Sequence, residues 1–216
     1  MIQYHSFAFN FAAEQTYIVW DETREACIID PGCSTPQEEK ILAEFIAQNK
    51  LIPVRLLCTH LHFDHCIGAG FVKDKWDIDP EASDIEIDSL PSLSDQLKAF
   101  GLGHLPVKDV CIQTFTFDEE AAIHFGKSVL RVRHVPGHSP GHVVFYEETA
   151  NILFAGDTLF NLGIGRTDLW GGDYDTLITA IRSQIFTLPD TTKVLPGHGP
   201  HTTVAFEKAH NPYFSC

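Results

Sequence analysis

The sequence predicts a single layered α/β domain, and three observations support this prediction. Short runs rich in β-branched and aromatic residues alternate with helical patterns, which is typical of helices packed on sheets. The chain has 216 residues, a length that buries roughly 70% of the unfolded surface. No Gly/Ser-rich linker, repeat or low-complexity tract divides the sequence, so we expect one domain over residues 1–216.

The strand candidates contain mostly branched or aromatic residues, and each ends close to Asp, Gly, Pro or His. They are Thr16 to Trp20, Glu25 to Asp30, Val54 to Thr59, Val129 to Val135, His142 to Glu147, Asn151 to Gly156 and Lys193 to Pro196. The phenylalanines on apolar runs are expected in the core: Phe115, Phe117, Phe125 and Phe145.

Two helices are clearly marked. Thr35 is the expected N-cap of the first, with Pro36 at its first position and Glu38 completing a capping box. The second is expected from about Asp173 to Thr187, with an apolar stripe at helical spacing. Between them, residues 73–110 form an acidic stretch and a short helix candidate, which we interpret as an excursion over one face.

The composition limits the function. Acidic residues outnumber basic ones by 29 to 15, a net charge of −14 that would repel nucleic acid and anionic lipid. No apolar run approaches the roughly 18 residues of a membrane span, and no signal sequence is apparent. We therefore expect a cytoplasmic protein without nucleic-acid or membrane partners, and with its six cysteines reduced.

Residues 59–65, with the sequence THLHFDH, are the densest group of potential ligands. They follow a strand candidate and supply His60, His62, Asp64 and His65. Burying these side chains is costly without partners, whereas a divalent cation would satisfy them. His60 and His62 are expected on one side of an extended loop and Asp64 and His65 near a neighbouring point. This spacing favours two metal ions.

Three further ligand sites also follow strand candidates, and their glycines permit sharp turns. They contain His138 in PGH, Asp157 in AGD and His198 in PGHG. Side chains at strand ends on one edge of a sheet converge in space. Five histidines and two aspartates exceed the needs of one tetrahedral zinc and suit two ions that share a carboxylate.

The motifs HLHFDH, PGHSPGH, AGDTLF and PGHG, in that order, resemble the metallo-β-lactamase superfamily. The resemblance covers nearly the whole chain, since IIDPG at 28–32 also matches. It implies an αββα sandwich that binds one metal through His60, His62 and His138. It implies a second metal on Asp64, His65 and His198, with Asp157 bridging the two. True β-lactamases lack a carboxylate at the Asp157 position, so antibiotic hydrolysis is not expected.

Within the superfamily, GIGRTDL at 163–169 and Asn211-Pro212 resemble the glyoxalase II (hydroxyacylglutathione hydrolase) group in a short form without the C-terminal helical domain. The resemblance implies a small-molecule thioester substrate, a hydroxide that bridges two metal ions, and catalytic roles for Asp64 and Asp157. Arg166 falls where the family binds the substrate carboxylate, although an ion pair with Asp168 is an equal alternative. Pro200 replaces an aromatic residue that holds glutathione, which leaves the natural thiol open.

Imidazole and carboxylate ligands accept zinc, iron and manganese, and of these we expect zinc. A mono-iron persulfide dioxygenase is the main alternative, because that group shares the GRTD segment. The GHG form at 197–199 favours the hydrolase. A lactonase would use the same ligands on a cyclic ester. A non-catalytic module is disfavoured by the complete ligand set, and a di-iron electron carrier by His62, where such relatives carry Glu. The oligomeric state stays open.

Two neighbouring residues receive structural interpretations. His142, four residues after His138, is expected to be an ordinary strand residue. Cys66 is expected to pack beneath the loop rather than to bind metal, because a buried thiol behaves as a small apolar side chain.

Overall fold

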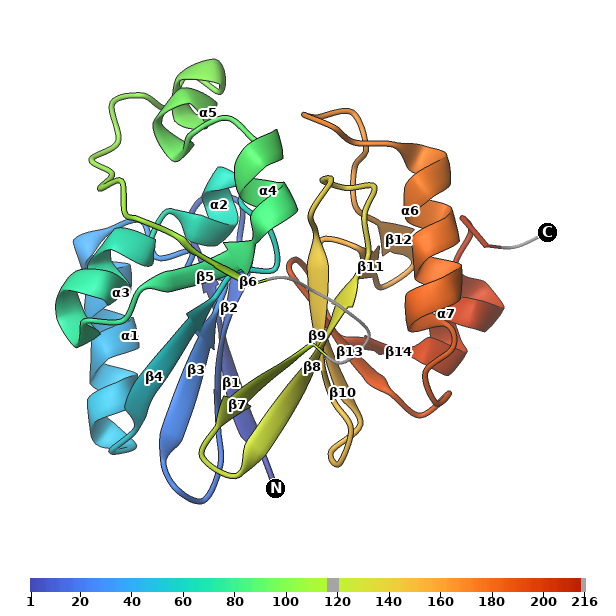
Figure 1. Ribbon diagram of the computed structural model, residues 1–216, viewed down its shortest axis with the longest axis horizontal. Coiled ribbons are helices and arrows are strands. Elements are labelled where there is room, and N and C mark those ends of the chain that lie inside the picture. Colours follow the sequence, from blue (N-terminus) through green and yellow to red (C-terminus); the bar gives the residue numbers. More distant parts are fainter. Residues whose placement is uncertain (116–120, 215–216) are drawn as a thin grey trace.

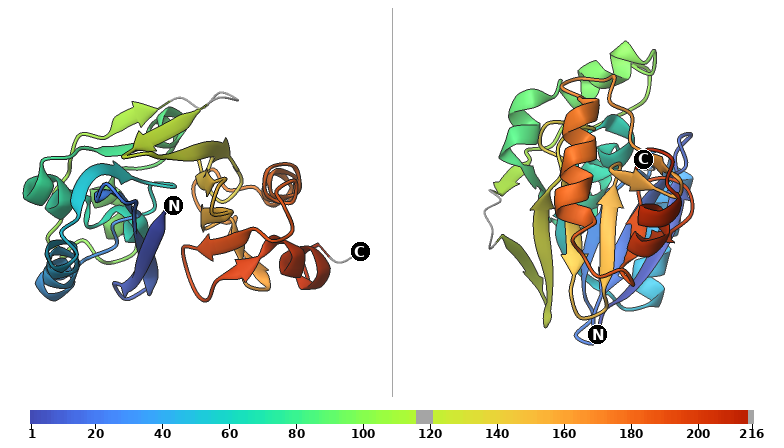
Figure 2. Two further views of the ribbon diagram at one scale, coloured as in Figure 1. Left: turned by 90° about the horizontal axis from the view of Figure 1, so that it is seen from below. Right: turned by 90° about the vertical axis from the view of Figure 1, so that its right-hand side faces the viewer.

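Within the described part of the chain, two six-stranded sheets form the centre of the molecule, and helices cover their outer faces (Figures 1 and 2). The computed structural model describes residues 1–115 and 121–214. Phe117 and Cys216 therefore lie outside the described residues. The helix–sheet–sheet–helix layering confirms the predicted αββα sandwich.

The first sheet has the order β1-β2-β3-β4-β5-β6, and the described helices of this half are α1 to α5. The strands are β1 (Gln3–Phe9), β2 (Glu14–Trp20), β3 (Glu25–Ile29), β4 (Ile52–Leu57), β5 (Pro80–Ser83) and β6 (Gln113–Phe115). The helices are α1 (Pro36–Gln48), α2 (Phe63–Cys66), α3 (Ala69–Trp76), α4 (Asp84–Ser89) and α5 (Leu93–Ala99).

The second sheet has the order β14-β13-β10-β9-β8-β7, with a small β11-β12 ribbon beside it. Its strands are β7 (Ala122–Phe125), β8 (Ser128–His134), β9 (Val143–Glu147), β10 (Ile152–Gly156), β13 (Lys193–Pro196) and β14 (Thr202–Thr203). The ribbon is β11 (Leu159–Phe160) and β12 (Gly163–Ile164), and the helices are α6 (Tyr174–Ala180), the π-helical turn η1 (Ile181–Ile185) and α7 (Val204–His210).

Side chains that alternate between the two faces of each strand form three apolar layers, one between the sheets and one beneath the helices on each side. In β3, Cys27 and Ile29 face the second sheet, whereas Ile28 packs with α1. In β10, Phe154 faces the first sheet, whereas Leu153 packs with α6. Successive strand side chains point to opposite faces, so each strand that is apolar throughout contributes to two layers.

Most predicted elements are confirmed to within two residues. The capping box of α1 forms as expected, with Glu38 N–H donating to Thr35 Oγ1 at 3.3 Å. Asp173 caps α6, and the predicted second helix continues through η1. Phe125 and Phe145 are buried and Phe115 packs against them in part. The described cysteines are free thiols, and no helix in the described ranges is long and apolar enough to cross a membrane.

Asp21 joins the two sheets, because it follows β2 and contacts the turn between β7 and β8. Its carboxylate accepts hydrogen bonds from Thr23 N (2.8 Å), Lys127 N (2.6 Å) and Ser128 Oγ (3.0 Å). Burial opposes ionisation of Asp21, but these donors outweigh it and lower the pKa to about 2. The ionised carboxylate therefore stabilises the folded state.

Asp21→Ala is expected to lower the free energy of unfolding at pH 7 by about 2–4 kcal/mol, because charged hydrogen bonds are lost. The folded pKa lies below the unfolded value, so this stabilisation is present above about pH 4 and is lost as the pH falls through about 2. Urea unfolding at pH 7 and pH 3 measures the difference. The exposed neighbour variant Glu22→Ala is the control, and an equal effect in both would contradict the role of Asp21.

Candidate metal centre

Asp30 fixes the start of the loop that carries the densest ligand motif. Its Oδ1 accepts from Thr59 N and its Oδ2 from Thr59 Oγ1, both at 2.7 Å. Asp30 Oδ2 also lies 3.1 Å from His65 Nδ1. One buried carboxylate therefore sets both ends of the segment from Thr59 to His65.

The first cluster consists of His60, His62 and His138, all buried. His62 Nδ1 lies 2.8 Å from His138 Nε2, and His138 Nε2 lies 3.2 Å from His60 Nε2. Nitrogens bound to one tetrahedral ion are about 3.3 Å apart, given metal–nitrogen distances of about 2.0–2.1 Å. The three rings therefore have a spacing that suits one ion.

The second cluster consists of Asp64, His65 and His198. His65 Nε2 lies 3.3 Å from His198 Nε2, and His198 Nε2 lies 3.3 Å from Asp64 Oδ2. These residues come from α2 and from the loop after β13, which the fold brings to the same end of the sandwich.

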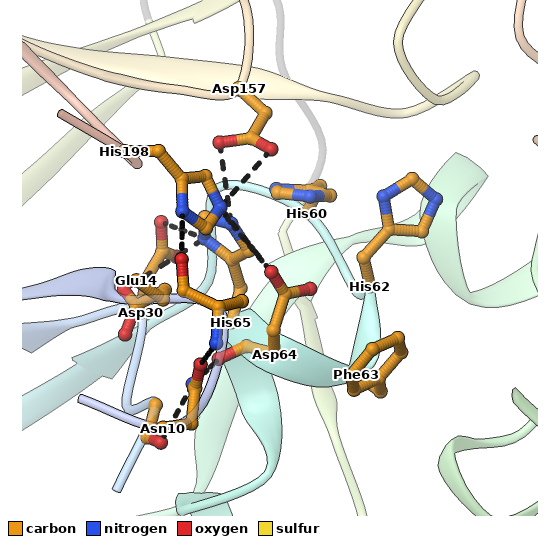
Figure 3. Close-up of polar contacts among 12 residues, drawn as sticks. Asn10, Glu14, Asp30, His60, His62, Phe63, Asp64, His65, Asp157 and His198 are labelled. Atoms are coloured by element: carbon orange, nitrogen blue, oxygen red, sulfur yellow. Dashed lines mark hydrogen bonds and ion pairs between the residues drawn. The ribbon is translucent and has the colours of Figure 1, made fainter. Parts of the chain in front are cut away.

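Asp157 lies between the two clusters. Its Oδ1 is 3.3 Å from His65 Nε2, and its Oδ2 is 3.7 Å from His138 Nε2. Figure 3 shows Asp157 and Asp64 turned toward the same imidazole, that of His198. All seven residues singled out by the sequence therefore meet at one place, with a carboxylate between the two groups of three.

The outer nitrogens of three histidines have acceptors, which leaves the inner nitrogens free to bind a cation. His138 Nδ1 lies 2.8 Å from the Arg166 carbonyl oxygen, and His198 Nδ1 lies 3.1 Å from the Ala12 carbonyl oxygen. His65 Nδ1 faces Asp30. Hydrogen bonds of this kind fix the tautomer of a metal-binding histidine. Several buried imidazole lone pairs facing one another are costly without a cation, so the residues fit two divalent ions.

The electrostatics of the first cluster and of Asp157 agree with that fit. Burial, together with neighbouring imidazoles, lowers the pKa of His60 well below its ordinary value and that of His62 to about 3. Both rings are therefore neutral at physiological pH, which is the form that binds metals. Burial opposes ionisation of Asp157, but the facing imidazoles, His65 foremost, outweigh it and lower its pKa. Cys66 is buried as expected, and burial raises the pKa of its thiol, which therefore stays uncharged.

Several supporting residues were missed or misjudged from sequence. His142 precedes β9 rather than lying in it; its ring stacks 4.7 Å from His60, and its Nε2 accepts from Asp157 N at 3.1 Å. Glu14 is fully buried near His65, and burial raises its pKa. The position of Glu14 at the start of a strand gives no sign in the sequence that its side chain is buried beside His65.

Two residues of the acidic excursion hold the backbone of the ligand loop. Glu86 accepts from Leu61 N at 3.1 Å and from Gly141 N at 2.7 Å, so it joins this loop to the loop of His138. Gln96 accepts from Phe63 N at 3.1 Å and donates to Leu61 O at 2.8 Å. The excursion therefore supports the metal loops.

The two clusters open into a cleft of about 500 Å³, within the range of small-molecule sites. It is lined by Phe11, Ala12, His62, Phe63, Asp64, Phe100, His138, Asp157, Phe160, Ile164, Arg166, Leu169, Trp170 and His198. Arg166 lies at this cleft, but its guanidinium pairs with Asp168 through bonds of 2.6 and 2.8 Å. The geometry thus matches the ion-pair alternative for Arg166.

Gly197→Ala is expected to impair metal binding without unfolding the chain. A Cβ at this position would lie 2.3 Å from Asp157 Oδ1 and 2.6 Å from His65 Cε1. We expect metal affinity to fall roughly 10- to 100-fold, as it does when ligand orientation is disturbed. Competition with a chromophoric chelator measures the affinity. Gly163→Ala, which meets only Phe160 carbons at 3.6 Å or beyond, is the control; equal affinities for both variants would contradict this account.

Comparison with known proteins gives the family. The profile of the Metallo-beta-lactamase superfamily matches residues 11–198. A curated relative named hydroxyacylglutathione hydrolase GloC, from Haemophilus influenzae, is 36% identical over 200 residues, 92% of this chain and 91% of its own.

Solved structures agree. The crystal structure of the BLEG-1 B3 metallo-beta-lactamase superposes with a TM-score of 0.88 at 31% identity, over 99% of this chain and 100% of that one. The structure of TTHA1623 in a di-iron-bound form gives a TM-score of 0.82 at 32% identity, and the match covers 97% of this chain and 99% of that one. The chain therefore belongs to the metallo-β-lactamase superfamily of metal-dependent hydrolases.

Proposed function

We propose that this protein hydrolyses a small thioester in the manner of glyoxalase II, with two divalent ions, zinc being the expected metal. The observation that carries the proposal is the pair of three-residue clusters joined by Asp157 at the floor of one cleft. Similarity to the relative named hydroxyacylglutathione hydrolase supports the thioester. The acidic chain is expected to act in the cytoplasm on a small molecule rather than on nucleic acid or a membrane.

Two divalent ions held by these residues would supply Lewis-acid activation of water and of the substrate carbonyl at neutral pH. The chain itself supplies orientation. The Arg166 and Ala12 carbonyls fix the rings of His138 and His198. Asp64 and Asp157 reach the cleft as ionised acceptors, which can hold and orient a water molecule against a bound carbonyl.

The second cluster favours the hydrolase over a mono-iron dioxygenase. The ligand atoms of Asp64, His65 and His198 lie within 4.8 Å of one another, as those of the first cluster do, and Asp30 and the Ala12 carbonyl orient the two imidazole rings. A reaction that needs only one ion would not require the second cluster. The proposal therefore rests on both clusters being used.

The test compares four substrates on the purified protein: lactoylglutathione, a glutathione persulfide with oxygen uptake recorded, an aliphatic lactone and a chromogenic cephalosporin. We expect the highest kcat/KM for the thioester. The cephalosporin is included because the fold is similar to that of the BLEG-1 B3 metallo-beta-lactamase. His124→Ala, an exposed histidine on β7, is the control for loss of an imidazole. Greater turnover of any other substrate would overturn the proposal in favour of that reaction.

A further inference from the structure

Four aromatic side chains form a continuous row along the cleft, and we call them the aromatic row: Phe11, Phe63, Phe100 and Trp170. The ring centroids are 5.9 Å apart for the first pair, 5.0 Å for the second and 6.0 Å for the third. Trp170 ends the row 6.3 Å from the ring of His62, in the first cluster. The row therefore runs from open solvent to the candidate metal centre.

These rings come from separate segments. Phe11 precedes β2, Phe63 begins α2, Phe100 follows α5, and Trp170 lies in the loop between β12 and α6. In Figure 1 the segments around α2 and α5 lie over one half of the sandwich, and the segment before α6 lies over the other. Phe63 itself is next to Asp64 in Figure 3. The two halves of the fold thus both contribute to one apolar wall.

Part of this wall is exposed to solvent. Phe11 is 65% exposed and Phe100 is 40% exposed, although both belong to stacked or tilted ring pairs. Large apolar side chains that remain exposed around a concave site mark a surface that a ligand covers. Covering them would remove apolar area from water, which favours binding.

The charged side chains of the cleft also favour an apolar ligand. Arg166 is the one Lys or Arg side chain among the described lining residues, and it is held in two hydrogen bonds by Asp168. The other charged lining residues are Asp64 and Asp157, which face the metal ligands. The cleft therefore offers little to an anionic substituent and much to an apolar one.

We propose that the aromatic row selects thioesters with a bulky apolar acyl group, such as an aryl acyl group. This inference rests on the proposed thioester hydrolysis and names its substrate class. The carbonyl must lie at the two clusters, and the proposal places the acyl substituent bonded to it against Trp170 and Phe100, because Trp170 is the ring of the row next to His62. In the reaction the C–S bond breaks, water supplies the oxygen of the new C–O bond, and the products are the carboxylic acid and the free thiol.

Mandeloylglutathione and lactoylglutathione test this inference, because they share the thiol and the α-hydroxyl and differ only in phenyl against methyl. The wild-type protein is expected to show at least about tenfold higher kcat/KM for the mandeloyl ester, the usual discrimination by an apolar pocket. In Trp170→Ala and in Phe100→Ala, the ratio of the two values is expected to fall to within about threefold of unity. Trp170→Phe, which keeps a ring in the row, should retain most of the preference.

Phe206→Ala is the matched control, since Phe206 lies on α7 outside the cleft and is 38% exposed; it should keep the wild-type ratio. Circular dichroism confirms that each variant is folded. Equal kcat/KM for the two esters, or variants that lower both equally, would overturn the inference alone. Hydrolysis of neither ester above the level of Asp157→Ala would overturn the proposed function, and the inference with it.

Discussion

Asp157→Ala is expected to remove nearly all turnover while the chain stays folded. Asp157 is the carboxylate between the clusters, 3.3 Å from His65 Nε2 and 3.7 Å from His138 Nε2. Without it, each of the two proposed ions would lose a ligand. Because a bound divalent ion supplies several kcal/mol of transition-state stabilisation, kcat/KM should fall about 10²- to 10³-fold or more.

The thermal unfolding midpoint of metal-free Asp157→Ala should stay close to that of metal-free wild type, because the cost of burying the carboxylate offsets much of its attraction to the facing imidazoles. Thermal unfolding in chelator and steady-state kinetics in added metal separate these effects. Asp175→Ala, which removes an exposed carboxylate from α6, is the control. Retained activity in Asp157→Ala would contradict a mechanism that uses both clusters.

Glu86→Ala is expected to have the second largest effect, and on stability as well as metal content. Glu86 is fully buried and accepts from the backbone N–H groups of Leu61 and Gly141. Alanine would leave both donors unpaired inside the protein. The free energy of unfolding should therefore fall by about 3–5 kcal/mol.

Glu86→Ala should also loosen the loop that carries His60 and His62, because Leu61 lies between them and its N–H loses its acceptor. This change should appear as a lower metal content at a temperature where the variant is still folded. Urea unfolding and elemental analysis of the same samples provide the two measurements. Asp88→Ala, an exposed acidic residue on the same helix, should match wild type in both. If Glu86→Ala behaved like Asp88→Ala, the supporting role of the acidic excursion would be wrong.

The convergence of the candidate ligands could be predicted from sequence because most of them follow the end of a predicted strand. His60, His138, Asp157 and His198 all come soon after a strand ends, and such residues meet at one end of a sandwich. The apolar strands and the capped helix α1 follow similar local rules. Sequence spacing therefore located the seven residues, and their role as ligands is a proposal that metal analysis can test.

The supporting contacts could not be predicted, because they join segments far apart in the chain. Glu86 lies in an acidic stretch whose other members are exposed or half-buried, and nothing nearby in the sequence distinguishes the one carboxylate that is fully buried. From sequence His142 is expected to be an ordinary strand residue, yet it precedes β9 and its ring stacks on that of His60. The aromatic row combines four distant segments, so no spacing in the sequence reveals it.

The most direct test of the central claim is the metal content of protein purified without added metal or chelator. The two clusters predict about two equivalents of divalent metal per chain, with zinc expected. In Asp157→Ala the content should fall to about one equivalent or less. A reproducible single iron per chain in the wild type, unchanged by loss of Asp64 or His198, would contradict the two-metal account and favour the dioxygenase.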